Sequence, residues 1–82
     1  MLKPRDRLLL AFYLYGPCTY AEIAEYLGHL RSRVSIANQY NLHVGYLVGH
    51  REVNNRGHRV LRFTVTPEGR EYLRTQGHRQ VT

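Results

Sequence analysis

Residues 47–66 read LVGHREVNNRGHRVLRFTVT, and this stretch predicts a long β-hairpin. Two runs of seven residues, rich in β-branched and apolar types, flank the turn 54–59. In the second run Leu61, Phe63 and Val65 alternate with outward-facing positions. The expected strands are residues 47–53 and 60–66. Because strands of this length span about 20–24 Å, the turn is expected to project well beyond the body of the domain.

Three helices are expected before the hairpin. Pro4 suits the first turn of a helix, and the Thr19-x-x-Glu22 pattern matches a capping box in which each side chain binds a free backbone N–H of the other residue. Gly28 can supply the left-handed end of the second helix. A third helix is expected to begin at the cap Ser32. The expected ranges are 4–15, 20–27 and 32–44.

The third helix divides into two sides when successive residues are stepped by about 100°. The side expected to face the core is apolar and consists of Val34, Ile36, Ala37, Tyr40 and Val44. The opposite side is polar and consists of Ser35, Asn38, Gln39 and His43, with Arg31 where the helix begins. A helix of this kind can pack on a small core while it presents amides and cations outward.

A short last helix completes the expected order of elements. Thr66-Pro67-Glu68 supplies a cap, a proline at the first position and an acid in the first turn, and the helix is expected to end near Thr75. The fold class is therefore α+β: a three-helix core, a two-stranded hairpin and a short C-terminal helix. At 82 residues the chain has room for one domain. We assign that domain to residues 1–77 and a flexible tail to residues 78–82.

The positive charge of the chain is concentrated in its second part. The formal net charge is +6, and from residue 31 onward nine Arg face three Glu, whereas charges cancel before that point. A concentrated positive field favours a polyanion as partner, since neutralising phosphates releases counterions. Arginine in particular can hold a phosphate or a guanine edge with two hydrogen bonds. We therefore expect nucleic acid as the partner.

Other classes of protein are disfavoured by what the sequence contains. It has no Gly-rich phosphate loop, no nucleophile elbow and no close pair of carboxylates, so no enzyme and no cofactor is expected. The five His are scattered, which gives no metal site. Cys18 is expected to be a small buried residue, the alternative being an oxidant sensor at a helix start. No apolar run is long enough for a membrane span, and we expect a cytoplasmic location.

Four local patterns occur in an order that resembles winged helix-turn-helix regulators of the MarR and PadR kind. They are Thr19-x-x-Glu22-Ile23-Ala24-x-x-Leu27-Gly28, Arg33-Val34-Ser35, Gly45-Tyr46-Leu47-Val48 and Thr66-Pro67-Glu68-Gly69-Arg70-x-Tyr72-Leu73. The resemblance covers roughly residues 4–75. It implies that the third helix lies in the DNA major groove and that the hairpin turn, called the wing, reaches a flanking minor groove or its phosphates. The chain departs from the family at Asn38 and Asn41, where aliphatic residues are usual.

The chemistry of the side chains suggests how they would contact DNA. The amides of Asn38 and Gln39 match the edge of adenine, and arginines can read guanine or hold phosphate. The full set of expected DNA-binding residues is Arg31, Ser32, Arg33, Ser35, Asn38, Gln39, His43, Arg56, His58 and Arg59. Arg51 and Arg62 on the strands are weaker candidates for phosphate contacts.

The predicted function is that of a sequence-specific regulator of transcription that binds double-stranded DNA. The alternatives are a winged helix that binds another protein and an architectural DNA-binding protein of weak specificity. RNA is less favoured, since the tyrosines fall at core spacing. The first helix carries more apolar surface than one small core can use, so a homodimer is expected, with an interface of Leu9, Leu10, Tyr13 and Leu14. Any small-molecule effector is left open.

Overall fold

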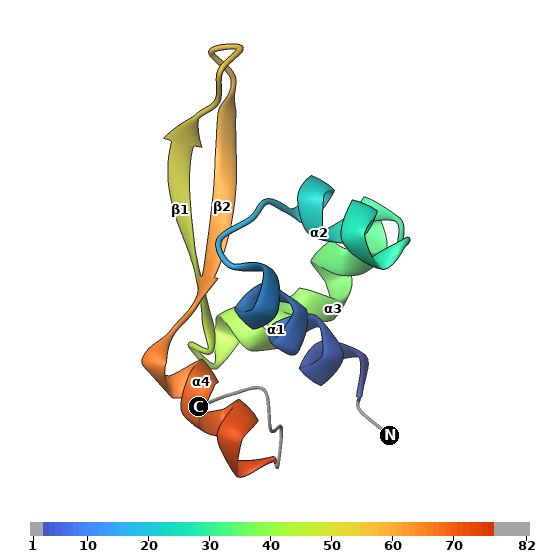
Figure 1. The fold of residues 1–82 in the computed structure, drawn as a ribbon, viewed down its shortest axis with the longest axis vertical. Coiled ribbons are helices and arrows are strands. Elements are labelled where there is room, and N and C mark those ends of the chain that lie inside the picture. Colours follow the sequence, from blue (N-terminus) through green and yellow to red (C-terminus); the bar gives the residue numbers. More distant parts are fainter. Residues whose placement is uncertain (1–2, 77–82) are drawn as a thin grey trace.

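The computed structural model describes residues 3–76. Its helices lie together, and a long hairpin rises from one side of them (Figure 1). The elements are α1 (Pro4–Tyr15), α2 (Tyr20–Leu27), α3 (Arg31–His43), β1 (Leu47–Val53), β2 (Arg59–Val65) and α4 (Pro67–Thr75). Each expected element is present, and its bounds agree to within about one residue. The predicted tail, 78–82, lies outside the described residues. None of these helices has the length and apolar character needed to cross a bilayer.

Local side-chain caps define where α2 and α4 begin. The backbone N–H of Thr19 donates to Glu22 Oε1 at 2.9 Å, and that of Glu22 donates to Thr19 Oγ1 at 3.1 Å, which is the predicted capping box. Thr66 Oγ1 accepts from the backbone N–H of Gly69 at 3.1 Å. The cap predicted for α3 is wrong, because Leu30 precedes the helix and Ser32 lies within its first turn.

Helix α1 forms the centre of the molecule (Figure 1), with α2, α3 and α4 around it. Its buried side chains are Asp6, Leu8, Leu9, Ala11 and Phe12. The Phe12 ring meets the rings of Tyr20 and Phe63 edge-on at 6.5 and 6.0 Å between centroids, which joins α1 to α2 and β2. Leu9 has no exposed surface. Its prediction as a dimer contact is therefore wrong, because α3, α4 and β2 already cover the helix.

The hairpin is antiparallel, with Leu47 paired to Val65 at its base and Val53 paired to Arg59 near its tip. Only the base enters the core, where Leu47 and Phe63 are buried. Leu61, which was expected to face inward, is exposed because the strands continue past the core into solvent. The hairpin gives the molecule its long axis, 40 Å against 24 and 22 Å.

Cys18 connects the loop before α2 to the hairpin. Its backbone N–H donates to the carbonyl of Phe63 at 3.3 Å, and the N–H of Phe63 donates back at 2.9 Å. The side chain is buried, which confirms the expectation of a small core residue. Burial, and then the charge of Glu22, raises the pKa of the Cys18 thiol to about 11. The oxidant-sensing alternative, which needs a lowered pKa, is not supported.

We expect Cys18 to react very slowly with Ellman's reagent at pH 8 in the folded protein. The thiolate is the reactive form, and both burial and the raised pKa suppress it. The comparison is with the same protein in concentrated urea, where the single thiol should react at the rate of a free cysteine. Equal rates in the two conditions would contradict the buried placement.

Candidate nucleic-acid interface

Helix α3 presents a continuous outer stripe to solvent. The positions that it buries are Val34, Asn38 and Asn41. At about 100° per residue, the direction opposite to them is occupied by one residue from each successive turn. These exposed residues are Ser32, Ile36, Gln39 and His43, with exposed Arg33 and Tyr40 along one flank. Ser35 is half-buried on the other flank.

The prediction that Asn38 reads a base is wrong, because Asn38 is 0% exposed. Its Nδ2 donates to the hydroxyl of Tyr20 at 3.4 Å, and its Oδ1 accepts from Asn41 Nδ2 at 3.0 Å. Asn41 Nδ2 also donates to the backbone carbonyl of Arg5 at 3.0 Å. The two amides thus form a polar connection between α3, α2 and the start of α1.

The two buried asparagines also explain why the predicted burial of several apolar residues of α3 is wrong. Ile36, Tyr40 and Val44 were expected to face the core but are exposed. With Asn38 and Asn41 inside, the helix is rotated by about a quarter of a turn from the orientation that its apolar residues predict. The only sign of this rotation in the sequence was that asparagines replace the usual aliphatic residues at these two positions. The guanidinium of Arg5 lies over the ring of the exposed Tyr40, 3.9 Å from its centroid.

The tip of the wing is organised by its own backbone. Asn54 Oδ1 accepts from the N–H groups of Arg56 and His58 at 3.0 and 2.9 Å, and the N–H of Asn54 donates to the His58 carbonyl at 2.8 Å. Gly57 has φ +78°, a conformation that other residues adopt only with strain. The side chains of Arg56, His58 and Arg59 are exposed, as expected. The tip therefore presents its cations on a defined turn.

The arginines fall into two groups according to their partners. Arg62 pairs with Glu22 and Glu52, and Arg74 pairs with Glu71. Seven others are exposed and form no salt bridge within the described part of the chain. These are Arg7 on α1, Arg31 and Arg33 on α3, Arg51, Arg56 and Arg59 on the hairpin, and Arg70 on α4. Most of the uncompensated charge thus lies on the first turn of α3 and on the wing.

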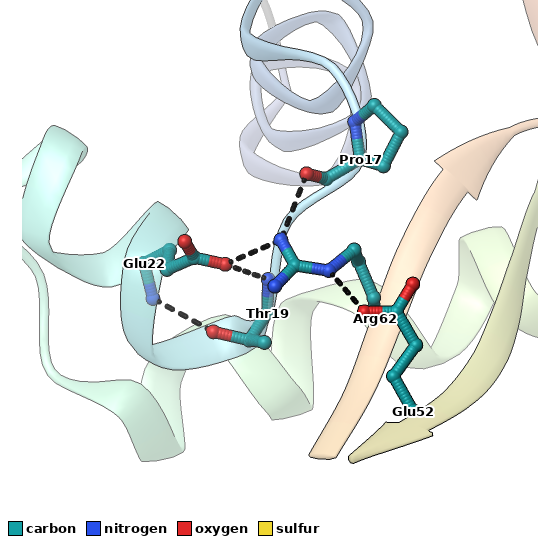
Figure 2. A network of polar contacts seen from close by, with 5 residues as sticks. All are labelled: Pro17, Thr19, Glu22, Glu52 and Arg62. Atoms are coloured by element: carbon teal, nitrogen blue, oxygen red, sulfur yellow. Dashed lines mark hydrogen bonds and ion pairs between the residues drawn. The ribbon is translucent and has the colours of Figure 1, made fainter. Parts of the chain in front are cut away.

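Arg62 fastens the wing to the helices, as Figure 2 shows. Its Nε donates to Glu52 Oε2 at 2.9 Å across the hairpin. Its Nη1 donates to Glu22 Oε1 at 2.9 Å and to the carbonyl of Pro17 at 3.2 Å. The same oxygen of Glu22 accepts the capping bond from Thr19. This N–H of Thr19 is the main cause that lowers the pKa of Glu22, and the charge of Arg62 adds to it.

This network makes Arg62 a positioning residue for the wing rather than a free phosphate contact. Because it joins the middle of β2 to the N-terminal end of α2, it restricts the angle at which the hairpin leaves the core. The sequence showed only an outward-facing arginine on a strand. Its helix-side partners, Glu22 and Pro17, lie 40 and 45 residues upstream and become visible only in the fold.

We expect Arg62→Met to weaken DNA binding several-fold while the salt dependence of binding changes little. The variant frees the wing but removes no phosphate contact, and a phosphate contact would lower the log–log salt slope by about 0.9. Arg51→Met is the matched control, since Arg51 is exposed on the partner strand and carries no acidic partner among the described residues. A salt slope lowered by about 0.9 in Arg62→Met would restore Arg62 as a phosphate ligand.

An apolar groove of about 510 Å³ lies beside the outer stripe, between the start of α1, the end of α2 and the first half of α3. Leu8, Leu27 and Val34 contribute to its wall, and its charged lining residues, Arg7 and Arg33, are cationic.

Within residues 3–76, no three His, Cys, Asp or Glu side chains lie close enough together to hold a metal ion.

No protein-family model matches the chain, and no curated protein matches it in sequence. Solved structures do match. A candidate transcriptional regulator from Thermoplasma acidophilum aligns with a TM-score of 0.78 and 15% identity, over 90% of this chain and 76% of that one. The adhesin competence repressor AdcR from Streptococcus pyogenes aligns with a TM-score of 0.71 and 18% identity, over 98% of this chain and 57% of that one.

These likenesses, together with the element order and the projecting hairpin, confirm the predicted winged helix-turn-helix fold. At such identities they show the fold alone. The narrower assignment to the MarR or PadR kind stays a prediction. The AdcR chain is much longer than this one, which spans little more than half of it.

Proposed function

We propose that the protein is a transcriptional regulator that binds a specific sequence of double-stranded DNA. The observation that carries the proposal is that arginines with and without acidic partners lie in different parts of the molecule. Arg62, which has acidic partners, joins the hairpin to α2, whereas most of the arginines without a salt bridge lie on the start of α3 and on the hairpin. A protein that places uncompensated cations on an exposed helix and a projecting hairpin is suited to a duplex, whose phosphates line both grooves.

In this proposal α3 enters the major groove, with its outer stripe against the bases. Gln39 can bind adenine at N6 and N7, and Arg33 can bind guanine at O6 and N7. The hydroxyls of Ser32 and Ser35 and the imidazole of His43 suit phosphate oxygens, as does Arg31 at the first turn. Asn38 leaves this set because it is buried, and we add Ile36 and Tyr40 because they are exposed.

The wing supplies the second contact. Arg56, His58 and Arg59 lie on the ordered turn at the far end of the hairpin. Arginine in a narrow minor groove gains from its enhanced negative potential, and against the backbone it neutralises phosphate. The descriptions of the two structural neighbours as a regulator and a repressor support a regulatory role for such a module. Occupying an operator and blocking polymerase is the simplest form of that role.

A homodimer remains part of the proposal, with a changed interface. Leu9 is excluded by its burial, whereas Leu14 is 53% exposed and stands next to Tyr15, whose ring stacks on Tyr26 at 4.5 Å. Leu10 and Tyr13 are half-buried. A two-fold pair would place two recognition helices about 34 Å apart on successive major grooves. Sedimentation of the free protein and of the DNA complex tests this, and a monomer in both would reject it.

A protein-interaction module is the second candidate, and the apolar groove beside the exposed Leu30 and Ile36 favours it. The two candidates differ in what footprinting would show. On a site selected from a random pool, dimethyl sulfate interference should appear at guanine N7 in the major groove under α3 and at adenine N3 in the flanking minor groove. Arg56→Ala with Arg59→Ala should remove only the flanking signal. Absence of any binding to duplex at low salt would reject the proposed function in favour of the second candidate.

A further inference from the structure

The outer stripe of α3 contains one aliphatic side chain among polar ones. Ile36 is 69% exposed and lies about 200° around the helix from Val34, which is buried. Its neighbours one turn away are Ser32 and Tyr40 on one diagonal and Arg33 and Gln39 on the other. An aliphatic residue in the middle of a polar, cationic surface is not needed by the core, since the core closes on the opposite side of the helix.

The major groove of DNA offers one apolar group to such a side chain. In the major groove, thymine alone among the four bases carries a methyl group, which apolar side chains contact. Polar atoms line the rest of that surface, and an isoleucine placed against them would gain little. Ile36 is therefore suited to thymine and unsuited to cytosine at the same position.

We infer that Ile36 is a specificity-determining residue that contacts the C5 methyl of a thymine, an inference that rests on the proposed DNA-binding function. The position of Ile36 relative to Gln39 on the helix limits how far apart the two recognised bases can lie. The two residues are separated by about 4.5 Å along the helix axis, compared with about 3.4 Å between successive bases on a strand. With Gln39 on an adenine, the thymine read by Ile36 lies within one or two base pairs of that adenine.

The same exposed surface would also suit an apolar segment of another protein, because Ile36 contributes to the groove beside α3. The charged groups around it argue for DNA. Arg7 and Arg33 line the groove, and Arg31 is the first residue of α3, with no acidic partner among the described residues. A purely apolar partner would have to desolvate these cations without compensation, whereas the phosphates of a duplex would neutralise them.

The test replaces single thymines by deoxyuracil in a duplex selected from a random pool by the protein itself. Deoxyuracil keeps every hydrogen-bonding group of thymine and lacks only the methyl. We expect one position at which this change raises the dissociation constant about fourfold, the factor that corresponds to about 0.8 kcal/mol for one buried methyl-sized group. In Ile36→Ala the same change at that position should have no effect.

Val53→Ala is the matched control, because Val53 is 68% exposed and lies on β1, outside α3. It should keep the full sensitivity to deoxyuracil. Deoxyuracil that is tolerated at every position, or an effect that persists unchanged in Ile36→Ala, would overturn the inference while leaving DNA binding intact. If no duplex binds at all, the proposed function fails and the inference fails with it.

Discussion

Replacing both Arg56 and Arg59 with alanine is expected to weaken binding to every duplex about 60-fold at 0.1 M salt, whatever its sequence. Each arginine that neutralises a phosphate contributes about 0.9 to the slope of log affinity against log salt. Two contacts therefore account for about 1.8 in that slope, and hence for about 60-fold between 1 M and 0.1 M salt. Fluorescence anisotropy with a random and a selected duplex measures both quantities.

The control for this prediction is Arg70→Ala with Arg74→Ala. Both residues are exposed on α4, and the double variant lowers the net charge by the same amount as the wing variant. It should lose much less affinity, because a change in overall charge acts only through the screened field. If the two double variants lose affinity equally, the wing makes no localised contact with DNA and its assigned role is wrong.

Asn38→Ala is expected to lower the free energy of unfolding by about 2–4 kcal/mol. The substitution leaves a cavity and takes away the carbonyl oxygen that accepts from Asn41 Nδ2 at 3.0 Å. Since a chain of this length is stable by only about 4–12 kcal/mol, the loss would be a large part of the total. Urea denaturation followed by circular dichroism measures it.

The adjacent residue gives the opposite result. Gln39 is exposed on the outer stripe, so Gln39→Ala should change the free energy of unfolding by less than about 0.5 kcal/mol. It should instead narrow the difference in affinity between the selected and the random duplex, since it removes a base contact and no phosphate contact. A stable Asn38→Ala protein that had lost its sequence preference would mean that Asn38, and not Gln39, faces the DNA.

The positions of the helices and strands were predictable because the signals that set them are local. The capping box at Thr19 and Glu22, the proline at the start of α4 and the turn residues of the wing each act within a few residues of the chain. The predicted and observed bounds therefore agree closely. The order of elements was enough to identify the fold, which the structural neighbours confirm.

The rotation of α3 was not predictable in the same way. Burial of an asparagine is favourable only when its amide finds partners, and the partners of Asn38 and Asn41 are Tyr20 on α2 and the carbonyl of Arg5 on α1. A prediction from polarity alone, without knowledge of how the three helices pack, places both amides on the surface. Because both amides are buried, α3 is oriented differently from the prediction, and Ile36 and Tyr40 lie at the surface.

A similar difficulty affected α1 and Arg62. The apolar residues of α1 point in nearly all directions, which suggested a surface left for a second subunit. The structure shows a central helix, whose Leu8, Leu9 and Phe12 are covered within one chain. The pairing of Arg62 with Glu22 joins residues forty positions apart, and no spacing rule in the sequence connects them.

A salt titration of binding to two labelled duplexes, one random and one selected by the protein, decides whether α3 and the wing bind DNA. We predict a slope that corresponds to several phosphate contacts for both duplexes, together with an affinity for the selected one that is at least about 10³-fold higher. A steep slope without that difference would indicate an architectural DNA-binding protein. No binding to either duplex even at low salt would contradict the claim that α3 and the wing form a DNA-binding surface.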